Sequence, residues 1–320
     1  MPRLRLIWRA LIVLPVLVAG PKLANGLEID RSEVSIPSAF PADTRAIPAR
    51  LLVPQGHGPF PAVVVMHDCS GLGPKSSGAP ARWSNLLAAQ GYVAIMPDSF
   101  TPRGLPDGVC TTAVSQAQRV TVGEPVRDRD AYSTLAYLHT LPYVDKAHIG
   151  IMGGSHGGSA TLIAMAELDP RYALTPIAQA KRAGFAAGIA LYPGCGANYG
   201  TWRITRQFGD HGPMTGYSGV YQPIAPVLIL VGALDNWTPA SDCQALADRS
   251  VQSGYPVDIK VYPDAWHSFD SGAPVRFVEN RNNASSVNGQ GATTGGNPAA
   301  WADSILQVKS FFSKYLGGPR

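Results

Sequence analysis

The chain has 320 residues, and its hydrophobic fraction of 45% is ample for a large core while its charged fraction of 15% is low. The formal net charge of +4 does not indicate a nucleic-acid-binding protein, because four of the 26 basic residues lie in a predicted leader. Without Arg3, Arg5, Arg9 and Lys22, 22 basic residues face 22 acidic ones, so no net charge and no basic stripe remain.

Residues 1–26 are predicted to be a secretory signal peptide. A basic stretch over residues 2–9 precedes an apolar stretch over residues 10–19, and Ala24, Asn25 and Gly26 supply small residues for a cleavage site. The apolar stretch is too short to cross a bilayer comfortably, which disfavours a membrane anchor. We therefore expect an exported protein, periplasmic or secreted, with no membrane span after signal removal.

From residue 27 onward, short apolar runs alternate with helical patterns. Residues 27–36 and 46–53 predict an opening pair of antiparallel strands. Buried strands are then predicted over residues 61–66, 92–96, 147–152, 185–192, 226–231 and 257–262. Helices are predicted over residues 81–90, 125–141, 158–166, 239–253 and 301–315. This alternation predicts one α/β domain over residues 27–320, with an eight-stranded, mainly parallel sheet covered by helices on both faces.

Three stretches, residues 101–123, 193–225 and 271–298, are rich in Gly, Pro, Asn and Ser and are predicted to be irregular. All three follow strands, so we expect them to build a pocket at one sheet edge. None is long and helical enough for a large cap domain, which predicts an open pocket. Aromatic residues near this edge are expected to serve core packing rather than substrate contact, and residues 281–283 are expected to be mobile. The aromatic residues in question are Tyr192, Tyr217, Trp237 and Trp266.

The most specific motif is Gly153-Gly154-Ser155-His156-Gly157, a G-x-S-x-G pattern between a predicted strand and a predicted helix. In this context the pattern is typical of a nucleophile elbow, in which small neighbours allow a very tight turn. The turn lifts the Ser155 hydroxyl clear of the sheet. We therefore predict that Ser155 is a catalytic nucleophile, the alternative being a purely structural Gly-rich turn.

A serine nucleophile needs a histidine base and an orienting carboxylate, and in α/β hydrolases these follow in the order Ser, Asp or Glu, His. Asp235 follows the strand at 226–231, and His267 follows the last strand at 257–262. Each therefore belongs at the sheet edge that carries Ser155. The other histidines lie in less suitable places, and His156 directly follows the serine. The predicted triad is Ser155, Asp235 and His267 on an α/β-hydrolase fold.

A developing oxyanion in this fold is bound by two backbone N–H groups. One belongs to the residue after the nucleophile, which is His156. The other comes from the loop after the third strand, where residues 67–73 read His-Asp-Cys-Ser-Gly-Leu-Gly, and we assign it to Cys69. The alternative is a plain Gly-containing turn.

The chain resembles the dienelactone hydrolase family, in its exported, disulfide-containing branch. The resemblance spans most of the chain after the leader and rests on the stretches at 67–72, 97–104, 153–157, 232–235 and 266–270. It implies a hydrolase of carboxylic esters or lactones, with the nucleophile, acid, base and hole donors at the positions given above. The founding members carry cysteine at the elbow, and serine here favours an ordinary esterase. Arg103 is a candidate for a substrate-binding arginine, although a structural salt bridge is the preferred interpretation.

Four cysteines in an exported chain indicate disulfides, and sequence alone allows three pairings. Cys69 and Cys110 follow strands that are neighbours in an α/β-hydrolase sheet, and so do Cys195 and Cys243. We therefore predict the disulfides Cys69–Cys110 and Cys195–Cys243. Four free thiols are the alternative, and no C-x-x-C or tight Cys/His cluster indicates zinc.

The leading functional prediction is an exported serine hydrolase that cleaves small ester or lactone substrates through an acyl-enzyme, without a metal or organic cofactor. A peptidase or polyester depolymerase with the same triad is the closest alternative, since the fold does not choose the leaving group. A non-catalytic binding protein on the same scaffold is the alternative from another class. The oligomeric state is left open.

Overall fold

The structure, a computed structural model, describes residues 28–40, 43–168 and 175–318. The predicted signal peptide, residues 1–26, lies outside these ranges. Within the described part of the chain, no helix is both long enough and apolar enough to cross a bilayer.

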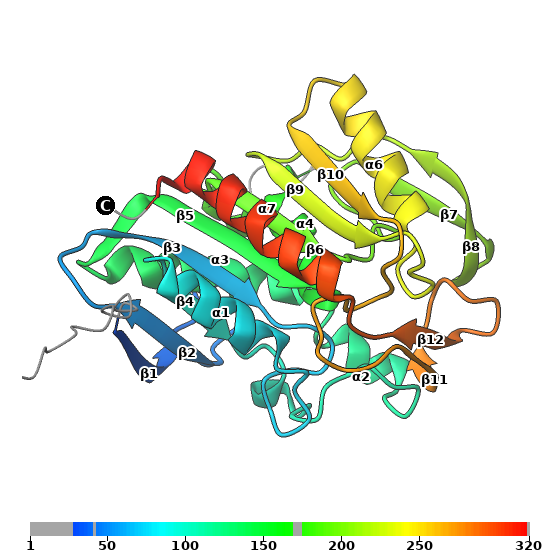
Figure 1. Cartoon of the computed structure of the whole chain (residues 1–320), viewed down its shortest axis with the longest axis horizontal. Helices are drawn as coiled ribbons and strands as arrows, with labels where there is room; N and C mark the ends of the chain where they lie inside the picture. The colour runs from blue at the N-terminus through cyan, green and yellow to red at the C-terminus, as the bar shows by residue number, and fades with distance from the viewer. Residues whose placement is uncertain (1–27, 41–42, 169–174, 319–320) are drawn as a thin grey trace, which may run out of the picture.

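An eight-stranded sheet forms the centre of the molecule, in the order β1-β2-β4-β3-β5-β6-β9-β10 (Figure 1). The first three strands in this order pair antiparallel, and all pairs from β4 to β10 are parallel. The predicted α/β-hydrolase architecture is therefore confirmed. The strands are β1 (Ile29–Ile36), β2 (Ile47–Pro54), β3 (Phe60–Met66), β4 (Val93–Pro97), β5 (Val144–Gly154), β6 (Ala187–Leu191), β9 (Val227–Gly232) and β10 (Val257–Tyr262).

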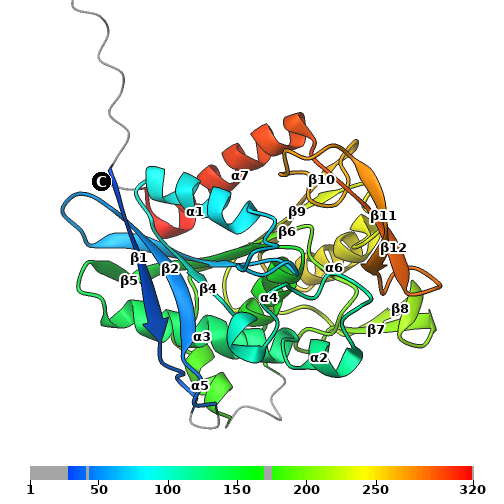
Figure 2. The same cartoon turned by 90° about the horizontal axis from the view of Figure 1, so that it is seen from below.

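Helices cover both faces of this sheet, as Figure 2 shows. On one face, α1 (Ala79–Ala89) and α7 (Pro298–Leu316) pack Leu87 and Phe312 against Val63 and Val65. On the other face, α3 (Glu124–Thr140), α4 (His156–Met165) and α6 (Ala240–Gln252) belong to the cluster that contains Val64. Because successive residues of β3 alternate between the two clusters, its continuous apolar run is buried on both sides.

The register of the parallel strands brings their carboxyl ends to one edge of the sheet. Met66, the last residue of β3, pairs with Gly153 of β5, and Gly154 pairs with Leu191 of β6. The loops that follow β3, β5, β9 and β10 consequently meet at this edge, where ligands bind in open α/β sheets.

The prediction that three loop stretches are irregular was wrong. They contain two short helices, the 3-10 helix η1 (Thr101–Arg103) and α2 (Gln116–Val120), and two hairpins, β7 (Arg203–Phe208) with β8 (His211–Ser218) and β11 (Arg276–Asn282) with β12 (Gln290–Thr294). A further helix, α5 (Pro176–Lys181), was not predicted. These elements are largely exposed, so their strands lack the continuous apolar runs that indicate a buried sheet.

The expectation of mobility at residues 281–283 was also wrong. Asn283 is 1% exposed, and its amide donates hydrogen bonds to the carbonyl oxygens of Asn236 and Gly291 at 3.0 and 2.7 Å. Asn-rich sequence here supplies side-chain bonds that fix a turn rather than chain freedom.

Candidate active site

Ser155 occupies a sharp turn between β5 and α4. Its backbone has φ 54° and ψ −120°, a conformation that non-glycine residues rarely adopt. The glycines of the motif are required by close approach, because a Cβ at Gly157 would lie 2.1 Å from the carbonyl oxygen of Met66. A Cβ at Gly153 would lie 2.5 Å from the backbone of Gly157. The elbow is therefore wedged against the end of β3.

The structure brings Ser155, His267 and Asp235 into one hydrogen-bonded chain. His267 Nε2 lies 2.9 Å from Ser155 Oγ, and His267 Nδ1 lies 2.7 Å from Asp235 Oδ2. All three residues are buried, at 8%, 0% and 4% exposure. An imidazole placed between a hydroxyl and a carboxylate can accept the hydroxyl proton through one nitrogen while the other stays oriented.

Asp235 is fixed by the turn that follows β9. Its Oδ1 accepts the backbone N–H groups of Trp237 and Thr238 at 2.9 and 2.8 Å, and its Oδ2 accepts the Thr238 hydroxyl at 2.9 Å. These donors orient the carboxylate toward His267. The nearby Asp270 is held elsewhere, since it accepts hydrogen bonds from Trp83 Nε1 and the Tyr192 hydroxyl, both at 2.7 Å.

Two aromatic rings enclose the imidazole of His267. The Tyr192 ring meets it edge-on at 4.8 Å between centroids, and the Trp237 ring lies at 4.7 Å. Trp237 also lines the cavity in front of Ser155. Its place therefore differs from the expected role in core packing alone. Tyr192 packs against the histidine from the core side, consistent with that expectation.

The backbone N–H groups of Cys69 and His156 are the predicted donors to an oxyanion. Cys69 follows β3, and His156 is the first residue of α4, where helix N–H groups have no intrahelical acceptor. Among the described residues, neither of these N–H groups donates a backbone hydrogen bond in the loops or turns. Both residues line the cavity that contains Ser155.

A buried cation lies behind this loop. Arg127 is fully buried and donates through Nη2 to the carbonyl oxygen of His67 at 2.6 Å, and burial lowers the pKa of its guanidinium to about 10. Burial, together with the charge of Arg127, holds the pKa of His67 and of His156 well below the usual histidine range. His67 accepts the Ser99 N–H at Nε2, which fixes the neutral ring.

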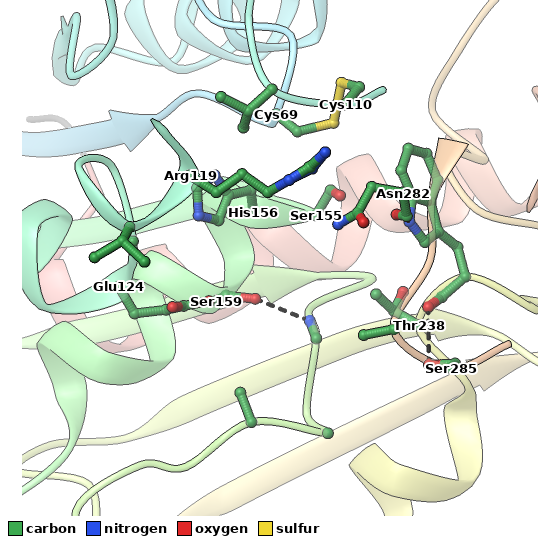
Figure 3. Close-up of a pocket in the computed structure, with 18 of the residues that line it drawn as sticks. Cys69, Cys110, Arg119, Glu124, Ser155, His156, Ser159, Thr238, Asn282 and Ser285 are labelled. Atoms are coloured by element: carbon green, nitrogen blue, oxygen red, sulfur yellow. Dashed lines mark hydrogen bonds between the residues drawn. A yellow bond between two sulfur atoms is a disulfide. The ribbon is translucent and has the colours of Figure 1, made fainter. Parts of the chain in front are cut away.

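The cavity in front of Ser155 measures about 670 Å³. Figure 3 shows Ser155 and His156 with the Cys69–Cys110 disulfide, Arg119 and Asn282 around them. All three stretches that were predicted to be irregular contribute to the lining, through Arg119 of α2, through Gly194 and Gly196, and through Asn282 of β11. Glu124 of α3 adds a carboxylate. The lining mixes apolar surface with a few polar groups, as small-molecule sites do.

Both predicted disulfides are present. Cys69–Cys110 lines the cavity, and Cys195–Cys243 is buried beneath it. Next to Cys110 the chain pairs with β11, since the Asn282 N–H donates to the Cys110 carbonyl at 3.0 Å and the Thr112 N–H donates to the Asn280 carbonyl at 2.9 Å. The first disulfide therefore connects the loop after β3 to the β11–β12 hairpin.

Arg103 does not line this cavity. Its guanidinium is 2% exposed and binds both carboxylate oxygens of Asp130 at 2.8 Å. The structural salt bridge, which was the preferred interpretation, accounts for it.

A family model for the dienelactone hydrolase family matches residues 47–316. The chain belongs to this family. As a dienelactone hydrolase family member it is a hydrolase of carboxylic esters or lactones.

Relatives of this family member carry related names. A Methylorubrum extorquens protein assigned as a carboxymethylenebutenolidase is 27% identical over 254 residues, which cover 77% of this chain and 74% of that protein. A Bradyrhizobium protein assigned as a 2-oxo-3-(5-oxofuran-2-ylidene)propanoate lactonase is 26% identical, over 69% of this chain and 78% of that protein.

Solved structures share the fold. A Klebsiella pneumoniae protein assigned as a dienelactone hydrolase superposes with a TM-score of 0.60 at 20% identity, covering 90% of this chain and 100% of that one. Thermogutta terrifontis esterase 2, phosphorylated by paraoxon, superposes with a TM-score of 0.56 at 14% identity, covering 92% and 96%. At these identities the likeness concerns the fold alone.

Proposed function

We propose that residues 27–320 form a serine hydrolase that cleaves carboxylic esters or lactones through Ser155, His267 and Asp235. The observation that supports this proposal is the continuous hydrogen-bonded chain from Ser155 Oγ through the imidazole to Asp235 Oδ2, with both links under 3 Å. A serine in a strained turn at a helix N-terminus, with a base already in hydrogen-bond reach, is suited to nucleophilic attack.

In the proposed reaction, Ser155 Oγ attacks the acyl carbon while His267 Nε2 takes the hydroxyl proton. The carbonyl electron pair moves to oxygen, and the N–H groups of Cys69 and His156 bind the resulting alkoxide. Collapse of this intermediate expels the alcohol, which His267 protonates, and leaves an acyl group on Ser155. A water molecule, deprotonated by His267, then attacks the acyl carbon and releases the acid. Asp235 holds the imidazole in the required tautomer throughout.

Two features favour general ester turnover by this site. The nucleophile is serine, whereas the founding family members carry cysteine. The cavity also opens between loops, with no large helical cap among the described residues, so it suits modest acyl groups more than long lipid chains. The names of the two relatives extend the candidate substrates to lactones.

A fluorophosphonate probe tests the nucleophile directly, because it reacts with activated serines. We expect labelling on Ser155, identified by peptide mass spectrometry, and loss of labelling in Ser155→Ala. Ser159→Ala is the matched control, since Ser159 lines the same cavity one helical turn later and accepts the Gly194 N–H through its hydroxyl. Labelling that persists in Ser155→Ala, or that disappears in Ser159→Ala, contradicts the assignment.

A substrate panel separates the alternatives. Aryl esters of graded acyl length, lactones, peptide anilides and a soluble polyester are compared under one set of conditions. We expect turnover of short aryl esters to exceed that of peptides and polyester. A preference for peptides or polyester would indicate a peptidase or a polyester depolymerase that uses the same three residues. No turnover of any substrate, together with no labelling by the fluorophosphonate, would indicate a binding protein.

We also propose export, supported by the two disulfides, which persist in oxidising compartments. Fractionation of cells that express the full chain should place the processed protein outside the cytoplasm, with an N-terminus near residue 27. Deletion of residues 2–26 should keep it in the cytoplasm, and an unprocessed chain in the membrane fraction would argue for an anchor.

A further inference from the structure

A second cavity lies on the other side of the Cys69–Cys110 disulfide. It measures about 450 Å³ and is lined by three arginines, Arg82, Arg276 and Arg281, together with hydroxyl side chains that include Thr111 and Thr294. We call it the arginine cavity. It shares Cys110 with the cavity of Ser155 but contains neither Ser155 nor His267.

Strand β11 separates the two cavities. Its residue Asn282 lines the cavity of Ser155, and the preceding residue Arg281 lines the arginine cavity. Neighbouring side chains of a strand point to opposite sides, which places Asn282 and Arg281 in different cavities. The pairing of β11 with β12 is irregular between Val278 and Asn282, so strict alternation is interrupted and Arg276 lines the same cavity as Arg281. The arginine cavity is thus a distinct compartment rather than an extension of the proposed active site.

Arg281 has no hydrogen-bond acceptor among the described residues. Its Nε is buried without a partner, and its one specific side-chain contact is with the Trp237 ring, 5.2 Å below the guanidinium. A guanidinium offers five donors in a planar fork, and a stacked, partly buried arginine with all of them unused is a ready receptor for a planar anion. Arg276 adds a second cation. Burial, and to a lesser extent the charge of Arg276, lowers the pKa of Arg281.

The acidic residues that line the arginine cavity are already engaged. Asp68 accepts hydrogen bonds from the Ser70 N–H and from the hydroxyl groups of Ser70 and Ser77. Asp270 is bound by Trp83 and Tyr192, and Asp107 pairs with Lys75 at 2.8 Å. Asp68 attracts Arg281 at a distance, with no hydrogen bond between them. No carboxylate of the cavity therefore accepts a hydrogen bond from the Arg281 guanidinium, and its N–H donors are available to an anion.

We propose that the arginine cavity is a binding site for a small oxyanion, a carboxylate or a phosphate group, which Arg281 binds through paired N–H donors with Arg276 alongside. Carboxylate and phosphate both match the guanidinium fork, so both are candidate sources of the anion. This site lies beyond the proposed esterase function and does not depend on it.

Isothermal titration calorimetry tests the site without any assay of catalysis. Inorganic phosphate and succinate are titrated into the mature protein at constant ionic strength. We expect saturable binding with one site per chain, and the tighter of the two probes identifies the class of anion. Arg281→Met, which keeps an unbranched apolar stem and removes the guanidinium donors, should weaken binding at least tenfold. The control Arg249→Met, at an exposed position on α6, should bind as the wild type does.

Chemical protection keeps the test decisive if Arg281→Met fails to fold. Phenylglyoxal modifies accessible arginines, and peptide mapping of the wild-type protein reports each position separately. Phosphate or succinate should protect Arg281 and Arg276 while leaving modification of Arg119, in the cavity of Ser155, unchanged. The proposal is overturned by the absence of saturable binding, by unaltered affinity in Arg281→Met, or by protection of Arg119 in place of Arg281.

Discussion

Ser155 and its two hydrogen-bonded neighbours are held in place by different parts of the molecule. Ser155 is anchored to the central sheet, since its N–H donates to the Leu191 carbonyl of β6 at 2.9 Å and the elbow abuts the end of β3. Asp235 and His267 lie on loops that strand β12 joins. The Thr293 N–H donates to Asn236 Oδ1 at 2.8 Å, and the His267 carbonyl accepts the Gly295 N–H at 3.0 Å.

The position of Ser155 therefore depends on neighbouring residues in the chain, whereas the positions of Asp235 and His267 depend on residues far away in the chain. The elbow is specified by five consecutive residues between a strand and a helix. The alignment of the two loops depends on a hairpin that also pairs with residues 110–112, far away in the chain. We therefore expect damage to the elbow backbone to lower turnover more than damage to the connection between the β11–β12 hairpin and residues 110–112.

The largest effect should come from the hydrogen-bonded chain itself. His267→Ala and Asp235→Asn should each lower kcat roughly 10⁴-fold, and combination with Ser155→Ala should add little, because groups that act as a unit are not additive. Steady-state kinetics on short aryl esters, with melting temperatures to verify folding, measure this. Multiplicative losses in the double variants would mean that the three residues act independently.

The next effect tests the wedge at the elbow. Gly157→Ala should lower kcat about 100-fold, because the new methyl group collides with the Met66 carbonyl and displaces Ser155 by a fraction of an ångström. Gly272→Ala is the control, as a Cβ there meets no atom within 4 Å. Equal activity of the two variants would show that the elbow tolerates a shift.

The two disulfides distinguish the hairpin side from the core. They close similar stretches, with separations of 41 and 48 residues, so removal of either should cost roughly 2–4 kcal/mol of unfolding free energy. Activity should differ. Cys69→Ala/Cys110→Ala should lower kcat about tenfold at a temperature where the protein is folded, since loss of the disulfide detaches the loop of Cys69, the proposed oxyanion donor, from β11.

Cys195→Ala/Cys243→Ala should leave kcat within about twofold under the same conditions, well below the effect of one lost oxyanion donor. Urea unfolding supplies the stability, and kinetics at a temperature well below both transitions supply kcat. A larger loss of kcat in Cys195→Ala/Cys243→Ala than in Cys69→Ala/Cys110→Ala would mean that the active site depends more on the core disulfide.

The smallest expected effect concerns pH and stability. His67 is fully buried, and burial with the nearby Arg127 holds its pKa well below that of the unfolded chain, about 6.5. The unfolded state then binds a proton that the folded state does not. The contribution of neutral His67 to the unfolding free energy is fully present above pH about 6.5. Below that pH it falls by about 1.4 kcal/mol per pH unit, from this residue alone. Urea titrations at pH 7.5, 6 and 5 measure the slope, which His67→Gln should reduce.

Much of this architecture was predictable, for a physical reason. The strands β3, β5, β6 and β9 are buried on both faces, so each leaves a short apolar run in the sequence, and the elbow glycines mark a turn that larger residues cannot make. Asp235 was located because it lies in the turn after β9, and His267 because it lies on the loop after β10. The cysteine pairing followed from the order of the strands.

The hairpin β11–β12 was missed because its contacts are distant and its faces are exposed. Its pairing with residues 110–112 and the hydrogen bond from Thr293 to Asn236 leave no local pattern in the sequence. Arg281 and Asn282 could not be assigned to separate cavities until the strand that contains them both was known. Side chains that derive their role from a distant neighbour are those that sequence reading loses.

The strained backbone at Ser155 lowers the stability of the fold, while the proposed reaction requires a serine at this position. A residue without Cβ adopts φ 54° freely, whereas serine there costs of order 1–3 kcal/mol. Ser155→Gly should therefore yield a more stable protein that has lost its hydroxyl. Other interactions of the fold, chiefly those of the sheet on either side of β5, have to offset this cost. Evolution toward greater robustness at this one position would lead directly away from catalysis.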